Sequence, residues 1–279
     1  MSSRHADDLD FALQLAARAG ELLMRSYEQV LRVDRKSKRD VVTDVDYASE
    51  ALFIDAIRDR FPEDAILAEE SGRHESAAAG KSAIGASRAR WSRRTWVIDP
   101  LDGTVNYANG IPFFCVSLAL VYDGQPIIGV VHDPTRDETF VATAVGSATL
   151  YDRVTPVGRT IVPSDKEKLS DFVVSLALSG RAVATRVRAV RKVIRISRSM
   201  GSAALALAYV GHGRFDAYIQ TAGLSIWDIA AAGLIAERAG ATVTDLSGGP
   251  WFDLSRKSRS IGVLAAPAAH HAALLELAR

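Results

Sequence analysis

The first sixty residues carry apolar and polar positions in the period of two amphipathic helices. From about Asp7 to Val30, apolar side chains recur three or four positions apart, which predicts a helix with one buried face. Thr43-Asp44-Val45-Asp46 has the form of a capping box, so a second helix is expected to begin there. The expected apolar positions of this second helix are Tyr47, Ala51, Ile54, Ile57 and Phe61.

Continuous and alternating apolar runs after these helices predict strands. Ile66-Leu67-Ala68 and Thr95-Trp96-Val97-Ile98 are short runs of the buried-strand type. The segment from Cys115 to His132 reads as a β-hairpin with Asp123-Gly124 in its turn, and Glu138 to Thr143 supplies a further strand. We therefore expect an antiparallel first sheet.

The second half of the chain, from Asp171 onward, alternates between strands and helices. This order predicts a second sheet with helices outside it, and the fold class is therefore mixed α and β. The expected strands are Val193 to Ser197 and Phe215 to Ile219, and the expected helices are Ser202 to Val210 and Trp227 to about Ala239.

Length and composition allow one compact molecule with a sizeable core. The 279 residues are 48% hydrophobic, and no linker interrupts them. We expect two tightly joined lobes, an N-terminal lobe of residues 1–150 and a C-terminal lobe of residues 151–279. The start of the chain has no apolar leader, and no run approaches the length of a membrane span, so a cytoplasmic protein without a membrane partner is expected.

The overall charge does not indicate a protein that binds nucleic acid or a membrane, because the formal net charge is only +1. One stretch is nevertheless strongly basic, and its simplest interpretation is a solvated helix face; the alternative is a surface that attracts an anionic substrate or RNA. The stretch contains Arg181, Arg186, Arg188, Arg191, Lys192, Arg195 and Arg198. The single cysteine, Cys115, excludes an internal disulfide and reads as a small buried hydrophobe.

The hexapeptide Asp99-Pro100-Leu101-Asp102-Gly103-Thr104 is the most informative motif of the chain. Two carboxylates about 4 Å apart repel by roughly 4 kcal/mol at an effective dielectric near 20, and no basic residue within the motif offsets this. A hard divalent cation would offset it. Past the turn, the amides of Gly103, Thr104 and Val105 are free donors that suit a phosphate oxygen. The alternative is an ordinary Asp-Pro turn with an aspartate cap.

Two further acidic residues are candidates for the same site, because two carboxylates seldom complete a Mg²⁺ site. Glu69 follows a predicted strand, at the sheet edge where functional residues commonly collect. Asp228 lies in the first turn of a predicted helix. Taken singly, Glu69 could be a solvated loop residue and Asp228 a plain helix cap. The segment from Arg73 to Arg94, next to Glu69, has weak periodicity and is expected to be an exposed mobile loop.

These motifs together resemble those of the inositol monophosphatase family. The resemblance rests on the segment from Trp96 to Tyr107, on Trp227-Asp228-Ile229-Ala230-Ala231-Ala232-Gly233, and on Ala68-Glu69-Glu70-Ser71-Gly72 upstream. It implies a layered α-β-α-β-α sandwich and a lithium-sensitive, usually dimeric phosphomonoesterase. It also implies two or three Mg²⁺ ions, for which Mn²⁺ could substitute, because oxygen ligands favour these metals over zinc.

The resemblance further implies roles for individual residues. The implied metal ligands are Glu69, Asp99, the Leu101 carbonyl, Asp102 and Asp228. Thr104 and Asp46 are expected to orient a water that attacks the phosphorus directly, with Asp102 beside them. The expected substrate-binding residues are Gly103, Thr104, Gly201, Ser202, Ala203, Gln220 and Asp228.

The substrate expected first is myo-inositol monophosphate, with other phosphate esters left open. Many inositol phosphatases have a glutamate where this chain has Gln220, so the charge-assisted contact with ring hydroxyls is lost here. Relatives handle fructose 1,6-bisphosphate, histidinol phosphate or 3′-phosphoadenosine 5′-phosphate, of which the first is the best alternative. A different class of function, a regulatory module that binds RNA or protein through the basic stretch, is disfavoured by the intact acidic set.

Overall fold

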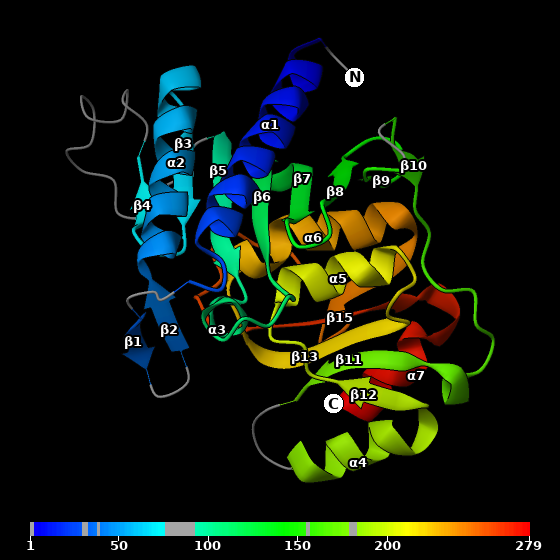
Figure 1. Ribbon diagram of the computed structural model, residues 1–279. Coiled ribbons are helices and arrows are strands. Elements are labelled where there is room, and N and C mark those ends of the chain that lie inside the picture. The colour runs from blue at the N-terminus through cyan, green and yellow to red at the C-terminus, as the bar shows by residue number, and fades with distance from the viewer. Residues whose placement is uncertain (1–2, 30–32, 38–39, 76–92, 155–156, 179–182) are drawn as a thin grey trace, which may run out of the picture.

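The protein consists of three helical layers separated by two β-sheets (Figure 1). The computed structural model describes residues 3–29, 33–37, 40–75, 93–154, 157–178 and 183–279. Helices α1 and α2 cover one face of the larger sheet, α5 and α6 lie between the sheets, and α4 and α7 lie on the far side of the smaller sheet. The expected α-β-α-β-α sandwich is therefore confirmed.

The larger sheet has eight strands in the order β10-β9-β8-β7-β6-β5-β3-β4. Its neighbouring strands are antiparallel except β3 and β5, so the expectation of a purely antiparallel sheet was wrong at this pair. The reason is that β4 forms a hairpin with β3, and the chain then returns to run beside β3 in the same direction. The strands are β3 (Ala65–Ala68), β4 (Gly72–His74), β5 (Arg94–Asp102), β6 (Cys115–Tyr122), β7 (Gln125–Asp133), β8 (Glu138–Thr143), β9 (Thr149–Tyr151) and β10 (Arg159–Thr160).

The smaller sheet has five strands in the order β12-β11-β13-β15-β14. The pairs β11/β12 and β11/β13 are parallel, and the other two pairs are antiparallel. The strands are β11 (Val173–Ala177), β12 (Ile196–Arg198), β13 (Ala217–Leu224), β14 (Ala241–Asp245) and β15 (Ile261–Pro267). The predicted strands at 193–197 and 215–219 were thus displaced, because helix α4 continues through Val193 and β13 continues past Ile219 to Leu224.

Two expectations about the N-terminal half are corrected by the structure, one about the end of the first helix and one about the segment from Arg73 to Arg94. Helix α1 (Ser3–Ser26) ends before Val30, and Glu28 beyond it has a left-handed φ of 62°, which a helix cannot continue through. Arg73 and Arg94 lie in strands β4 and β5 rather than in a loop, and residues 76–92 between them lie outside the described part of the chain. The remaining outer helices are α2 (Asp44–Arg60), α4 (Val183–Val193) and α7 (Ala268–Ala278).

Helix α2 begins at the predicted capping box but buries a different face from the predicted one. Thr43 accepts from the Asp46 amide, and the Asp46 carboxylate accepts from the Thr43 amide, as expected. Tyr47, however, is 52% exposed, whereas Ser49 and Glu50 are buried. These two polar side chains can be buried because each is hydrogen-bonded to a distant backbone group near the carboxyl end of β3 or β5.

Of the two central helices, α5 is apolar on every side and α6 is apolar except near its two ends, because sheets cover both of their faces. In α5 (Ala203–Gly211) all residues from Ala204 onward are buried, and in α6 (Ile226–Ala239) small residues allow close approach to the larger sheet. A Cβ added to Gly129 of β7 would lie 2.7 Å from the Ala231 carbonyl oxygen. Glycine at this position therefore sets the distance between the two layers.

We expect Gly129→Ala to lower the free energy of unfolding by about 2 kcal/mol, because the new methyl group meets backbone that cannot move aside. The measurement is a denaturant titration monitored by circular dichroism. Gly249→Ala is the matched control, since a Cβ there meets its nearest atom at an ordinary 3.4 Å and the backbone has no left-handed φ. Equal free energies of unfolding for the two variants would contradict the close approach of Gly129 to the Ala231 backbone.

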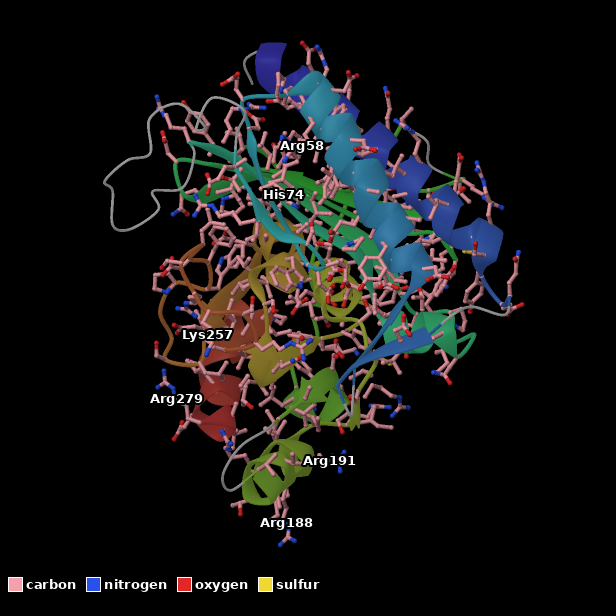
Figure 2. The ribbon with its side chains drawn as sticks, turned by 90° about the vertical axis from the view of Figure 1, so that its left-hand side faces the viewer. Arg58, His74, Arg188, Arg191, Lys257 and Arg279 are labelled. Carbon is pink, nitrogen blue, oxygen red and sulfur yellow. The ribbon has the colours of Figure 1, made fainter. Side chains whose placement is uncertain are left out.

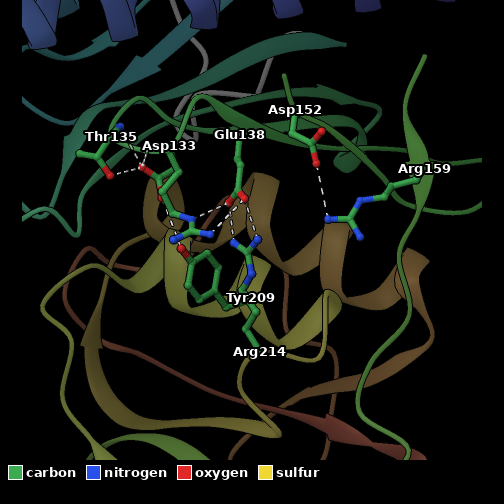
Figure 3. Close-up of polar contacts among 8 residues, drawn as sticks. Asp133, Thr135, Glu138, Asp152, Arg159, Tyr209 and Arg214 are labelled. Atoms are coloured by element: carbon green, nitrogen blue, oxygen red, sulfur yellow. Dashed lines mark hydrogen bonds and ion pairs between the residues drawn. The ribbon is translucent and has the colours of Figure 1, made fainter. Parts of the chain in front are cut away.

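A buried polar cluster joins the larger sheet to the end of α5 (Figure 3). The Glu138 carboxylate, at the start of β8, accepts hydrogen bonds from both terminal nitrogens of the Arg214 guanidinium at 2.5 and 2.7 Å. Arg136 Nε donates to the same carboxylate at 3.1 Å. The neighbouring Asp133 accepts from the Tyr209 hydroxyl at 3.3 Å. The contacts of Arg214 with Glu138 and of Tyr209 with Asp133 link residues 76 positions apart, so they help to fix the relative position of the β7-β8 hairpin and α5.

The remaining elements are short. Strands β1 (Val33–Ser37) and β2 (Asp40–Thr43) form a two-stranded antiparallel sheet, and α3 (Thr104–Ala108) is a single short helix that contacts β2. A 3₁₀ turn at Leu169–Asp171 precedes β11. Among the described helices, none has the length and apolar character that crossing a membrane requires.

Candidate active site

Three carboxylates from two distant parts of the chain meet at one point between the sheets. Asp99 and Asp102 belong to the carboxyl end of β5, and Asp228 lies in the first turn of α6. Each offers an oxygen, and these oxygens all lie within 4.8 Å of one another. The arrangement of several carboxylate oxygens at this spacing suits a hard divalent cation.

A bulge in β5 brings both of its aspartates to this point. Asp99 pairs with Ser117 and Asp102 pairs with Cys115, so three steps on β5 correspond to two steps on β6. Pro100, which has no amide proton for the ladder, occupies this irregularity. Gly103 then turns the chain with a left-handed φ of 100°, where a Cβ would lie 3.1 Å from the Phe113 carbonyl oxygen. The turn therefore requires glycine.

Asp102 and Asp228 are each held by backbone or side-chain donors on one oxygen. The Asp102 Oδ2 atom accepts from the Ser202 hydroxyl and from the Ala204 amide, both at 2.6 Å. The Asp228 Oδ2 atom accepts from the Ser225 amide at 2.7 Å and completes a capping box in which Ser225 is the cap. Asp228 thus does take part in capping its helix, and it also belongs to the carboxylate cluster.

Glu69 lines the same cavity, in the turn between β3 and β4. It interacts with the Asp99 carboxyl through charge and a side-chain hydrogen bond. The turn is held by Glu50 of α2, whose carboxylate accepts from the amides of Glu70 and Ser71 at 2.8 and 2.9 Å. The apolar pattern of the sequence did not predict a role for Glu50 in the site. The signal that could have identified it is a glutamate on an otherwise buried face of the helix.

The electrostatics of the cluster favour a bound cation. Burial, together with the charges of Glu69, Asp102 and Asp228, raises the pKa of Asp99 well above its usual value. Burial and the charge of Asp102 do the same to the pKa of Asp228. For Asp102, burial also raises the pKa, although the hydrogen bonds from Ser202 and Ala204 oppose the rise. Because the ionised forms are unfavourable alone, positive charge at this point would stabilise them.

Thr104 and Asp46 lie beside the carboxylates and contact each other. The Thr104 hydroxyl is 3.0 Å from the Asp46 Oδ1 atom and 3.0 Å from the Leu101 carbonyl oxygen, to either of which it can donate. The other Asp46 oxygen accepts from the Thr43 amide at 2.8 Å. The cap of α3 is Gly103, and Thr104 is the first residue of the helix.

Two adjoining cavities surround these groups. The larger, of about 490 Å³, is lined by Glu69, Asp99, Leu101, Asp102, Gly103, Thr104, Val105, Asn106, Gly201, Gln220, Gly223, Ser225, Trp227, Asp228 and Arg259. The smaller, of about 250 Å³, is lined by Asp102, Ser175, Ala177, Ser199, Met200, Gly201, Ser202, Ala203, Tyr218, Gln220, Gly223, Leu224 and Asp228. Every predicted site residue except Asp46 therefore lines one of these two cavities, and Asp46 reaches the larger through Thr104.

The predicted substrate segment Gly201-Ser202-Ala203 is fixed by contacts within the protein. The Ser202 hydroxyl donates to Asp102 and accepts from the Leu205 amide, so it caps α5. The Asn106 amide nitrogen donates to the Phe113 and Met200 carbonyl oxygens at 2.6 and 2.7 Å, which holds the chain beside Gly201. Asn106 was not among the predicted site residues, although it lies within the motif that carries the resemblance.

Gln220 lies on β13 where both cavities meet, and its amide is oriented by its neighbours. Its Oε1 atom accepts from the buried Tyr218 hydroxyl at 2.7 Å, and its Nε2 atom donates to the Ala222 carbonyl oxygen at 3.2 Å. Burial raises the pKa of Tyr218 well above its usual range, so this hydroxyl keeps its proton and remains a donor. The two hydrogen bonds therefore fix the orientation of the Gln220 side-chain amide, with its oxygen toward Tyr218 and its nitrogen toward Ala222.

Cys115 is buried as expected, whereas the expected solvated helix face holds only part of the basic stretch, because Arg186 of α4 is half-buried and donates to the Ala278 carbonyl oxygen. Cys115 is fully buried, with its sulfur 3.9 Å from the Asp102 carboxylate. Arg188 and Arg191 project from α4 into solvent (Figure 2), and Lys192 is exposed beside them. Arg195 and Arg198 lie beyond the helix, and Arg181 lies outside the described residues.

Comparison with known proteins identifies the chain's relatives. The sequence model of the inositol monophosphatase family matches residues 5–279. The chain belongs to this family. A fructose-1,6-bisphosphatase/inositol-1-monophosphatase of Thermotoga maritima is 37% identical over 87% of this chain and 86% of its own length. The protein named Nus factor SuhB of Pasteurella multocida is also 37% identical, over 86% of both chains.

Solved structures of this family have the same fold. The extragenic suppressor protein suhB of Bartonella henselae superposes with a TM-score of 0.84 at 30% identity and covers 98% of both chains. The Thermotoga maritima IMPase has a TM-score of 0.81 at 32% identity, and the match covers 98% of this chain and 96% of that one. The family is phosphatase-type and metal-dependent, and the acidic cluster of this chain is able to hold a metal.

Proposed function

We propose that this inositol monophosphatase family member is a Mg²⁺-dependent phosphatase of small phosphate monoesters, with myo-inositol monophosphate as the substrate to test first. The observation that carries the proposal is the convergence of Asp99, Asp102 and Asp228 within 4.8 Å, with the Thr104–Asp46 pair in the same site. Carboxylate and carbonyl oxygens are the ligands that Mg²⁺ and Mn²⁺ prefer. We assign Glu69, Asp99, the Leu101 carbonyl, Asp102 and Asp228 as the ligands of two or three such ions.

The chemistry then divides between the bound ions and the chain. Divalent ions at this position would supply positive charge for the phosphate oxygens and the leaving oxygen, and would acidify a water. The Thr104 hydroxyl donates toward Asp46 or Leu101, which leaves its oxygen lone pairs to accept from a water. Asp46, fully buried, keeps that hydroxyl in position. The backbone of Gly103 and Thr104 lines the cavity on the same side and is assigned to the phosphate.

The body of the substrate is assigned to the smaller cavity. Ser175, Ser199 and Ser202 line its wall, and so does Gln220, whose side chain is a neutral amide. Such a surface suits the hydroxyl groups of a polyol. Release of phosphate from myo-inositol 1-phosphate, fructose 1,6-bisphosphate, histidinol phosphate and 3′-phosphoadenosine 5′-phosphate would rank the candidates. No release from any of them with Mg²⁺ or Mn²⁺ would overturn the proposed activity.

We expect the activity to disappear in excess EDTA and to return when Mg²⁺ is added back, because the buried carboxylates cannot stabilise a phosphate dianion without cations. We also expect Li⁺ to inhibit at millimolar concentrations, because this small hard cation can occupy an oxygen-lined Mg²⁺ position. Phosphate release measured against both titrations is the test, with NaCl at equal ionic strength as the control. Full turnover in EDTA would remove the metal from the mechanism.

A second candidate is the regulatory role in which the basic stretch binds RNA, and several relatives of this chain are named Nus factor SuhB. The surface that would carry it is the exposed basic side of α4, which includes Arg188, Arg191 and Lys192. Binding of a fluorescent single-stranded RNA at two salt concentrations, to wild type and to Arg188→Glu/Arg191→Glu, would test this role. Equal binding by both proteins would exclude this surface.

A further inference from the structure

One face of helix α2 carries three buried polar side chains beside the candidate active site. They are Asp46, Ser49 and Glu50, whose spacing of three and four residues places them on the same side of the helix. Their exposed fractions are 0, 0 and 3%. Burial of a polar side chain is costly unless the group is hydrogen-bonded, so partners for all three are expected inside the protein.

Each of these side chains contacts a different segment of the site. The Asp46 carboxylate is 3.0 Å from the Thr104 hydroxyl. The Ser49 hydroxyl donates at 2.9 Å to the Pro100 carbonyl oxygen, in the bulge of β5 that brings two aspartates to the cluster. Glu50 contacts the third segment, the turn between β3 and β4. One helix face therefore fixes three separate segments of the chain around the site.

The Glu50 carboxylate binds the turn between β3 and β4 through two consecutive amides. Its Oε2 atom accepts from the Glu70 amide at 2.8 Å, and its Oε1 atom accepts from the Ser71 amide at 2.9 Å. The turn consists of residues 69–71, which lie outside the paired register of the two strands, so the ladder does not fix these amides. A carboxylate offers one oxygen to each amide, and here it comes from a helix and not from the hairpin itself.

This contact determines where the Glu69 side chain is directed. The Glu70 amide nitrogen belongs to the planar peptide unit that begins at the Glu69 Cα atom, so a hydrogen bond at this nitrogen fixes the orientation of that plane. Glu69 lines the larger cavity, and its side chain is hydrogen-bonded to that of Asp99. Without the Glu50 carboxylate, the backbone that carries Glu69 would lose two of the contacts that hold it beside the acidic cluster.

We propose that Glu50 is a positioning residue, which sets the Glu69 carboxylate at the acidic cluster and thereby raises the affinity for the divalent cation bound there. The inference rests on the proposed metal-dependent function. It adds a residue that acts without touching cation or substrate, since Glu50 is not among the residues that line the two cavities. Groups that hold a metal-ligating side chain in place commonly contribute roughly ten- to a hundredfold to metal affinity.

The test is a double-mutant cycle on cation affinity, with Glu50→Gln, Glu69→Gln and the double variant. Mn²⁺ is titrated into each metal-free protein, and the free ion is measured by electron paramagnetic resonance, so no turnover is required. We expect Glu50→Gln to weaken Mn²⁺ binding about tenfold when Glu69 is present and less than about twofold when Glu69 is already replaced. The reason is that Glu50 acts through Glu69 and has no ligand to position in its absence.

Two further variants separate the position of Glu69 from the charge of Glu50. Glu50→Asp keeps the charge but is one methylene shorter, so it should weaken Mn²⁺ binding to a similar extent. Asp55→Asn removes a charge from an exposed position of the same helix and should leave the affinity unchanged. In phosphate release, Glu50→Gln should raise the Mg²⁺ concentration for half-maximal rate about tenfold and recover most of kcat at saturating Mg²⁺.

An equal loss of affinity with and without Glu69, or full affinity in Glu50→Asp, would overturn the proposal. The first result would mean that Glu50 supports the fold in general, and the second that only its charge matters. If Glu50→Gln did not fold, as judged by circular dichroism, the cycle would be measured with Glu50→Asp. If wild type bound Mn²⁺ but released no phosphate from any ester of the panel, the proposed activity would fail, while the cycle would still decide the role of Glu50.

Discussion

Asp99→Asn is expected to lower the rate of phosphate release by at least about a thousandfold while the protein remains folded. Loss of one charged ligand removes several kcal/mol of charge stabilisation from the transition state, and each 1.4 kcal/mol corresponds to about tenfold in rate. Asp102→Asn and Asp228→Asn should behave alike. The measurements are steady-state kinetics at saturating Mg²⁺ and circular dichroism of each variant.

The same substitution should raise the melting temperature of the metal-free protein. The pKa of Asp99 is raised by burial and by the neighbouring carboxylates, so its ionised form is destabilising near neutral pH, and an amide of the same size removes that charge. In chelator, wild-type stability should therefore fall as pH rises above the usual aspartate range, and Asp99→Asn should reduce this dependence. Asp10→Asn, at an exposed position of α1, is the control and should change neither property. Unfolding of all three site variants would show that these aspartates are structural.

Thr104→Ala is expected to lower kcat about a hundredfold or more with little change in KM, because its hydroxyl is assigned to the attacking water and not to substrate binding. Thr104→Ser keeps the hydroxyl and should recover most of the activity. The measurements are kcat and KM for the best substrate of the panel and the melting temperature of each variant. A normal kcat in Thr104→Ala, together with a lower melting temperature, would remove Thr104 and Asp46 from the mechanism.

Much of the site was predictable because its parts are encoded locally. Asp99 to Thr104 form a continuous segment in which a proline and a glycine impose the bulge and the turn. The capping box of Thr43 and Asp46 is likewise a contact between residues three positions apart. In both segments the backbone geometry follows from the residues themselves, so the sequence was sufficient to predict the carboxylates, the helix start and the strand that leads to them.

The contacts that complete the site join residues far apart in the sequence. Such contacts cannot be predicted from the spacing of apolar positions along the chain. Ser49 and Glu50 interrupt the apolar pattern of α2, because their partners are backbone groups of Pro100, Glu70 and Ser71. Their burial could be understood only after α2 was placed over the ends of β3 and β5. The parallel pairing of β3 with β5 was missed for the same reason, since pairing depends on where the chain returns to the sheet.

The sequence by itself determined the family through its motifs, and the resemblance then implied the layered fold. The acidic residues of β5 were predictable because they lie in one continuous motif, and the period of apolar positions gave the mixed α and β class. The tertiary structure decided which of these residues come together in the candidate active site. It brought Asp228 to Asp99 and Asp102, set Asn106 against Met200, and placed Arg259 on the rim of the cavity. These proximities arise from the packing of two sheets around α5 and α6, which fixes distances between residues more than ninety positions apart.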